Sequence, residues 1–102
     1  QVEVEIEPGK TARRSYTIAS SPSQRAYVEL TVKREEHGVV SRHLHDHVET
    51  GDLLKLTGPF GKFTFNGSDA DSVVLIAGGV GITPMMSVLR YLTDIAWPGD
   101  IF

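Results

Sequence analysis

Apolar and polar residues alternate in two parts of the N-terminal half of the chain. Residues 2–6 (VEVEI) alternate aliphatic and acidic side chains, which predicts a half-buried antiparallel strand that ends at the turn Pro8-Gly9. Residues 26–34 (AYVELTVKR) alternate again, with three aliphatic side chains facing one way. This second alternation predicts the clearest strand of the chain.

Shorter elements are expected between residues 35 and 68. Ser41 is a suitable N-cap, and Leu44 and Val48 are four residues apart, so we expect a short helix over residues 42–47. Residues 53–57 and 63–65 read as strands on either side of a Gly-Pro turn.

The pattern changes after residue 71. Residues 73–77 are apolar without alternation, as in a parallel strand that is covered on both faces. Apolar side chains over residues 85–93 recur at helical spacing, with Thr83 as the expected N-cap and Pro84 as the first helical residue. Residues 100–102 read as the start of another strand. We therefore expect a first domain over residues 1–68 and the beginning of an α/β domain over residues 69–102.

Composition narrows the class of protein. The chain has 102 residues, of which 40% are hydrophobic and 23% charged, as in ordinary globular domains. A net charge of -3 argues against a nucleic-acid surface, and no apolar run is long enough to span a membrane. The absence of cysteine excludes disulfides and thiolate metal sites within the chain. We expect a cytoplasmic protein that binds neither nucleic acid nor membrane.

Arg14 and Tyr16 are the first candidate binding residues. If a strand begins near Ser15, they point to the same face, since side chains alternate along a strand. A guanidinium suits phosphate, and a tyrosine ring suits stacking on a heterocycle. The plainer alternative is a surface arginine beside a half-buried tyrosine.

Two glycine-containing loops are candidate anion sites. Residues 38–41 (GVVS) and 78–83 (GGVGIT) each lead into a predicted helix, whose free N–H groups and dipole favour phosphate. The second loop lacks the G-x-G-x-x-G spacing of dinucleotide sites, and such glycines also serve close packing. With Arg14, the two loops indicate two phosphate-bearing ligands.

The histidines of the predicted helix are a weak candidate for a metal site. His43 and His47 would share a helix face, a spacing that can bind zinc, but no third ligand is evident nearby. A solvated helix surface is the better interpretation, and no metal site is expected. Neither a nucleophilic triad nor a pair of catalytic carboxylates is indicated.

Four motifs occur in a characteristic order: residues 14–17 (RSYT), 38–41 (GVVS), 51–63 (GD…GPFGKF) and 78–84 (GGVGITP). Together they resemble the ferredoxin–NADP reductase superfamily, and most closely the reductase components of bacterial oxygenases and the reductase part of flavohaemoglobins. The resemblance implies an antiparallel flavin-binding β barrel, followed by the first β-α unit of an α/β nicotinamide-binding domain. It also implies that a strand precedes Gln1 and that further elements follow Phe102.

The resemblance assigns a role to each candidate residue. Arg14 would contact the flavin phosphate, Tyr16 the flavin ring, and Thr17 the ring edge near N5, so Tyr16 and Thr17 are the expected catalytic residues. The remaining cofactor-binding residues are expected to be Ile18, Val32, Lys33, Gly38, Val39, Val40 and Ser41 for the flavin, and Gly79, Gly81, Thr83 and Pro84 for the nicotinamide nucleotide.

The implied activity is that of a flavin-dependent oxidoreductase. Electrons would pass from NAD(P)H through FAD, with FMN as the alternative flavin, to an iron–sulfur or haem partner. The alternatives are a flavin- or nucleotide-binding fragment without turnover and a barrel without ligand. A barrel that lacks a strand would expose an edge, which favours pairing with a second copy of the chain.

Overall fold

A computed structural model describes all residues, 1–102. They form two compact units. The first unit consists of Gln1–Tyr16 and Val32–Gly61, and the second of Thr17–Thr31 and Lys62–Phe102. The expected boundary between two domains near residue 68 stays a prediction, because these units interleave segments from both sides of it.

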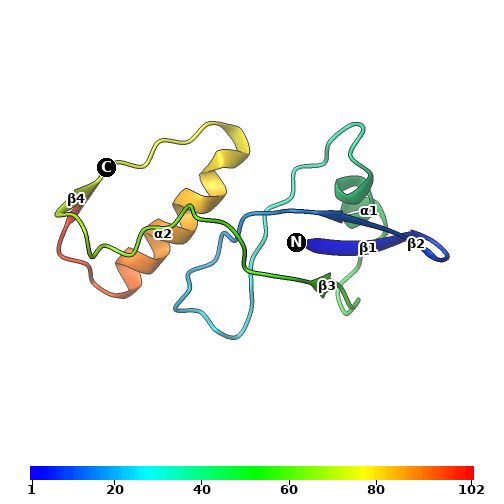
Figure 1. The fold of residues 1–102 in the computed structure, drawn as a ribbon, viewed down its shortest axis with the longest axis horizontal. Helices are drawn as coiled ribbons and strands as arrows, with labels where there is room; N and C mark the ends of the chain where they lie inside the picture. Colours follow the sequence, from blue (N-terminus) through cyan, green and yellow to red (C-terminus); the bar gives the residue numbers. More distant parts are fainter. The chain divides into compact units, whose positions relative to one another are not determined.

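The first unit contains a three-stranded antiparallel sheet. Its strands β1 (Val2–Glu7), β2 (Lys10–Arg14) and β3 (Lys55–Leu56) lie in the order β2-β1-β3 (Figure 1). The hairpin between β1 and β2 turns at Pro8-Gly9, where Gly9 has a φ of 77° that glycine adopts without strain. The strand predicted from residues 2–6 and its terminating turn are confirmed.

The core of the first unit lies between β1 and a helix, α1 (Val39–His47). Val2, Val4 and Val40 are almost completely buried, at 1%, 4% and 0% exposure. The apolar positions of the alternating N-terminal segment thus face the helix, as burial of one sheet face requires.

Helix α1 begins earlier than the sequence predicts, at Val39 with Gly38 as N-cap. The prediction that Ser41 caps the helix is wrong. The Ser41 hydroxyl lies inside the first turn, where it donates to the Gly38 carbonyl (3.2 Å) and accepts the Glu35 N–H (3.1 Å). It bonds backward to the loop before the helix because its side chain is buried there.

The strand predicted over residues 26–34 is wrong. The structure has only an isolated bridge between Ile18 and Leu30 in this segment. Alternating side chains make a segment suitable for a strand, but a strand also requires a neighbouring backbone to pair with. Residues 32–34 are instead bonded to side chains of α1. The strand expected to start near Ser15 is also wrong, since β2 lies before that point and ends at Arg14.

The second unit contains a strand–helix–strand arrangement. Strands β4 (Ser72–Val73) and β5 (Asp100–Ile101) are parallel and are connected through the 3₁₀ turn η1 (Gly79–Gly81) and helix α2 (Ile82–Asp94) (Figure 1). The predicted β-α-β order is confirmed. Strand β4 is shorter than residues 73–77. Beyond the two strands the pairing continues only through Phe102, whose N–H donates to the Val73 carbonyl (2.9 Å) and whose carbonyl accepts the Leu75 N–H (2.8 Å).

Two further local predictions differ from the structure. Residues 63–65 form no strand; Phe65 lies edge-on against the Trp97 ring, with ring centroids 5.8 Å apart. Helix α2 begins at Ile82 with Gly81 as N-cap, so Thr83 is not the cap and Pro84 is the third helical residue. Proline is tolerated there because the first-turn N–H groups have no helical acceptor.

The sheet of the first unit is open. Its three strands agree with the antiparallel part of the predicted fold, but they do not close a barrel. The barrel and the nicotinamide-binding domain are therefore taken up below as proposals. No helix of the chain has both the length and the apolar character needed to cross a membrane.

Candidate functional site

Arg14 and Tyr16 lie at the end of β2 and just beyond it, in the first unit. The Arg14 guanidinium is exposed, and its Nη1 donates to the Arg13 carbonyl (2.6 Å). Tyr16 is half-buried, and this burial raises the pKa of its phenol above the ordinary value, against the opposing charge of Arg14. Most donors of Arg14 therefore remain available to an anion, and Tyr16 keeps its hydroxyl protonated at neutral pH.

The loop before α1 is closely packed around Gly38. A Cβ at this position would overlap Ser41 Oγ and lie 2.9 Å from Glu35 Cβ, so internal packing alone requires a glycine. No side chain caps α1, which leaves its first N–H groups open to an anion. Val39 is exposed, whereas the Val40 side chain is buried in the core of the unit and the Ser41 hydroxyl donates to the Gly38 carbonyl. The backbone of this turn suits a phosphate better than the Ser41 side chain does.

Val32 and Lys33 precede this loop and are tied to α1. The Val32 carbonyl lies 2.6 Å from His45 Nε2, and Arg34 pairs with Asp46 on the same helix. Lys33 is exposed, 3.4 Å from the Glu35 carboxylate. The structure therefore brings Val32, Lys33 and the α1 turn together within the first unit, although no strand carries them.

The glycine loop at the start of α2 is open. A Cβ at Gly78, Gly79 or Gly81 would meet no atom within 4 Å, so close packing does not explain these glycines. No side chain caps α2, and the Thr83 hydroxyl donates back to the Val80 carbonyl (3.0 Å). The Gly81 N–H donates to the Gly78 carbonyl (3.1 Å) and the Ile82 N–H to the carbonyls of Gly79 and Val80. It is therefore the open space around the glycines that fits a phosphate-bearing ligand approaching the backbone closely.

The predicted site residues divide between the two units. Thr17 and Ile18 belong to the second unit, together with Gly79, Gly81, Thr83 and Pro84, and the flavin candidates described above belong to the first. Thr17 is exposed and Ile18 half-buried, and Ile18 forms the bridge to Leu30. The hydroxyl of Thr17 is thus at the surface, as contact with a ligand requires.

A hydrogen-bonded cluster beside Thr17 was not predicted. Arg90 Nη1 on α2 donates to the Ala19 carbonyl (2.7 Å) and to Glu29 Oε1 (2.8 Å), and Ser87 Oγ donates to the Ser20 carbonyl (2.9 Å). These partners are 61 to 71 residues apart in the chain. The only sequence signal is the spacing of Ser87 and Arg90, which places both on one face of a helix.

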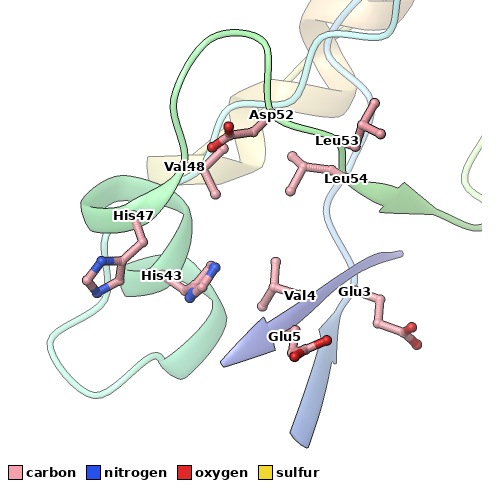
Figure 2. Close-up of a pocket in the computed structure, with 9 residues that line it drawn as sticks. All are labelled: Glu3, Val4, Glu5, His43, His47, Val48, Asp52, Leu53 and Leu54. Atoms are coloured by element: carbon pink, nitrogen blue, oxygen red, sulfur yellow. The ribbon is translucent and has the colours of Figure 1, made fainter. Parts of the chain in front are cut away.

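A separate pocket of about 340 Å³ lies in the first unit, between α1, β1 and the segment before β3 (Figure 2). His43 and His47 line it with their rings 5.4 Å apart, which confirms that they share a helix face. Histidine, aspartate and glutamate side chains nowhere gather in threes that could hold a metal ion. None of the predicted site residues lines this pocket.

Comparison with known proteins gives the family. Residues 1–65 match the model of the oxidoreductase FAD-binding domain, and the chain belongs to this family. The resemblance to the ferredoxin–NADP reductase superfamily is thereby confirmed.

The similar curated proteins include monooxygenase reductase subunits and flavohemoproteins. The chain is 44% identical over 93 residues to the glycine betaine monooxygenase reductase subunit of Chromohalobacter salexigens, covering 91% of this chain and 25% of the relative. It is 44% identical over 89 residues to a flavohemoprotein of Bacillus thuringiensis subsp. konkukian, covering 82% of this chain and 22% of the relative. The chain thus spans about a quarter of the length of the curated relatives it matches.

Proposed function

We propose that this chain is part of a flavin-dependent oxidoreductase that passes electrons from NAD(P)H through FAD to an iron–sulfur or haem partner. One observation carries the nucleotide part of this proposal. The glycine loop before α2 is open at Gly78, Gly79 and Gly81, and the helix that follows has no side-chain cap. Backbone N–H groups in such a setting bind phosphate.

Residues of the first unit would hold the flavin. Arg14 and the backbone at the start of α1 supply donors for phosphate, and Tyr16 offers an aromatic face just beyond the end of β2. Val32 and Lys33 adjoin that helix. We assign the three observed strands to a flavin-binding barrel over residues 1–68, which takes in the first unit and part of the second.

FAD, when bound, supplies the hydride-accepting chemistry, and the protein supplies binding, orientation and tuning hydrogen bonds. The exposed hydroxyl of Thr17 is the candidate donor to the ring edge near N5. Gly79, Gly81, Thr83 and Pro84 would border the nicotinamide nucleotide, at the start of an α/β domain over residues 69–102. A nicotinamide nucleotide bound beside this loop would be oriented for hydride transfer to the flavin.

The electron acceptor follows from the relatives by analogy. One is named as a monooxygenase reductase subunit and others as flavohemoproteins, which supports an oxygenase component or a haem group as acceptor. A cytoplasmic location agrees with this chemistry. The alternative function is flavin or nucleotide binding without turnover, and self-association through an open sheet edge stays a further prediction.

The test is the visible absorption spectrum of the purified protein after incubation with excess FAD or FMN and removal of free flavin. A retained two-band flavin spectrum that bleaches on anaerobic addition of NADH or NADPH would support the oxidoreductase. A retained spectrum that neither nucleotide bleaches would support the alternative of binding alone. If a protein of the full length of the relatives retained no flavin, both would be wrong.

A further inference from the structure

The segment that follows Thr17 is buried beneath polar side chains of α2. Ala19, Ser20 and Ser21 are 2%, 5% and 7% exposed, although the serines carry hydroxyl groups. Small side chains let the backbone of this segment approach the helix, and its carbonyl groups then need donors. Two of these carbonyls find their donors on α2 rather than in a sheet.

Arg90 and Ser87 are those donors. A single nitrogen, Arg90 Nη1, donates to the Ala19 carbonyl (2.7 Å) and to the Glu29 carboxylate (2.8 Å), which its two hydrogens allow. Ser87 Oγ donates to the carbonyl of the next residue, Ser20 (2.9 Å). The helix thus binds two consecutive carbonyls that lie two and three residues beyond Thr17.

Glu29 completes the cluster from the opposite side. Its carbonyl accepts the Ala19 N–H (2.9 Å), and its N–H donates to Ser20 Oγ (3.0 Å). Both backbone groups of Ala19 are therefore bonded, so little freedom remains for the backbone immediately after Thr17 and Ile18.

We propose that Arg90 and Ser87 are positioning residues, which fasten the Ala19-Ser20 backbone to α2 and thereby hold Thr17 in place for hydride transfer. The open glycine loop leads directly into the first turn of the same helix. One rigid helix would thus link the segment of Thr17 to the loop that binds the reductant. The fastening of the Ala19-Ser20 backbone rests on the hydrogen bonds alone. The effect on hydride transfer rests also on the proposed function.

The experiment compares Arg90→Met and Ser87→Ala with the unaltered flavin-loaded protein. Two quantities are measured: hydrogen exchange of the backbone amides, and the rate of flavin reduction by NADH or NADPH in stopped flow. We expect faster exchange at the amides of Ala19 and Glu29, without change in β1 and β2. We also expect the limiting reduction rate to fall about tenfold in Arg90→Met, the effect of losing the charge-assisted hydrogen bond to the Ala19 carbonyl. The nucleotide concentration at half-maximal rate should stay within about twofold, because the glycine loop is untouched.

Two control variants separate positioning from charge and from general damage. Glu29→Gln removes the ion pair but keeps the Arg90 bond to the Ala19 carbonyl, so its reduction rate should remain near that of the unaltered protein. Arg25→Met removes an exposed arginine that makes no hydrogen bond or ion pair in the same unit. It should change neither exchange nor rate. Arg90→Lys, which keeps a donor, should restore part of the rate and replaces Arg90→Met if that variant fails to fold.

The outcomes are distinct. Unchanged exchange at Ala19 and Glu29 in Arg90→Met would overturn the fastening, and faster exchange with an unchanged reduction rate would overturn the positioning role. A higher nucleotide concentration at half-maximal rate, with an unchanged limiting rate, would also overturn the positioning role. It would indicate an effect on the glycine loop. If the unaltered protein retained no flavin or were not reduced, the proposed function would fail and the catalytic role of Arg90 with it, whereas the exchange result would still decide the fastening.

Discussion

Arg34 donates two hydrogen bonds to the carboxylate of Asp46, from Nε to Oδ1 at 3.1 Å and from Nη2 to Oδ2 at 2.8 Å. This paired geometry ties the segment after Val32 to helix α1, where His45 adds a bond to the Val32 carbonyl (2.6 Å). Two consecutive residues of the helix therefore hold the segment that sequence alternation assigns to a strand.

The Arg34 bond holds the pKa of Asp46 below its ordinary value, which gives a pH-dependent prediction. A carboxyl whose pKa is lower in the folded chain stabilises it above the unfolded pKa, about 3.9, and loses that effect as the pH falls through the folded pKa. Asp46→Asn should thus lower the urea midpoint near neutral pH, and this loss should disappear in acid, once the pH lies below the pKa of Asp46 in the folded chain. Glu36→Gln, at an exposed residue without side-chain bonds, is the control. An equal loss at both pH values would contradict the prediction.

Gly67→Ala should destabilise the second unit. Gly67 has a φ of 85°, and a Cβ there would lie 2.7 Å from Trp97 Cδ1, while its carbonyl accepts the Trp97 indole N–H (3.0 Å). We expect the free energy of unfolding to fall by roughly 1–3 kcal/mol from the backbone conformation alone, and further from the overlap of the Cβ with the Trp97 ring. Thermal unfolding followed by Trp97 fluorescence measures it. Gly51→Ala, with φ 97° and open space, should show the smaller loss; equal losses would mean that the Trp97 contact is relieved without cost.

Arg14→Ala should weaken flavin retention. Arg14 is exposed and makes one side-chain bond, to the neighbouring Arg13 carbonyl, so its removal leaves the sheet intact. A charge-assisted bond to phosphate contributes roughly 1.5–3 kcal/mol, equivalent to about 10- to 150-fold in dissociation constant. Flavin fluorescence titration measures this change. Lys10→Ala, at the exposed start of β2, should bind flavin normally, and equal affinities for all three proteins would remove Arg14 from the site.

Thr17→Ala should slow flavin reduction without unfolding the protein. Its side chain is exposed and makes no hydrogen bond within the chain, so only a contact with ligand would be lost. One neutral hydrogen bond corresponds to about two- to tenfold in rate. Anaerobic stopped flow with NADH or NADPH measures the rate, with Thr11→Ala on β2 as the control. A rate equal to that of the control would exclude Thr17 from the mechanism.

Gly81→Ala should separate packing from ligand binding at the second loop. Gly81 has a φ of -60°, which any residue adopts, and its Cβ would meet no atom within 4 Å. The variant should therefore unfold at the same temperature or slightly higher, since alanine loses less backbone entropy on folding. Binding of NAD(P)H should weaken several-fold, as measured by the nucleotide dependence of flavin reduction. Unaltered binding would show that ligand does not approach the backbone there.

The sequence alone determined the elements whose bonds are local. The β1–β2 hairpin is specified by alternating residues around Pro8-Gly9, and α2 by apolar side chains at helical spacing. Helical hydrogen bonds join residues four apart, and a tight hairpin pairs neighbours, so a short window of sequence contains both partners. The family motifs could likewise be recognised because their order along the chain is itself a sequence property.

Only the tertiary structure decided the elements whose partners are distant. Residues 26–34 alternate as a strand should, yet their backbone pairing is limited to the contact of Glu29 and Leu30 with Ile18 and Ala19. Side chains of His45, Asp46 and Arg90 bond to the rest of the segment instead. The position of Ser41 inside the first turn of α1 also depends on burial against Glu35 rather than on its cap propensity. Alternation and propensity describe what a segment can form, whereas the bonds it makes depend on which donors and acceptors folding brings within reach.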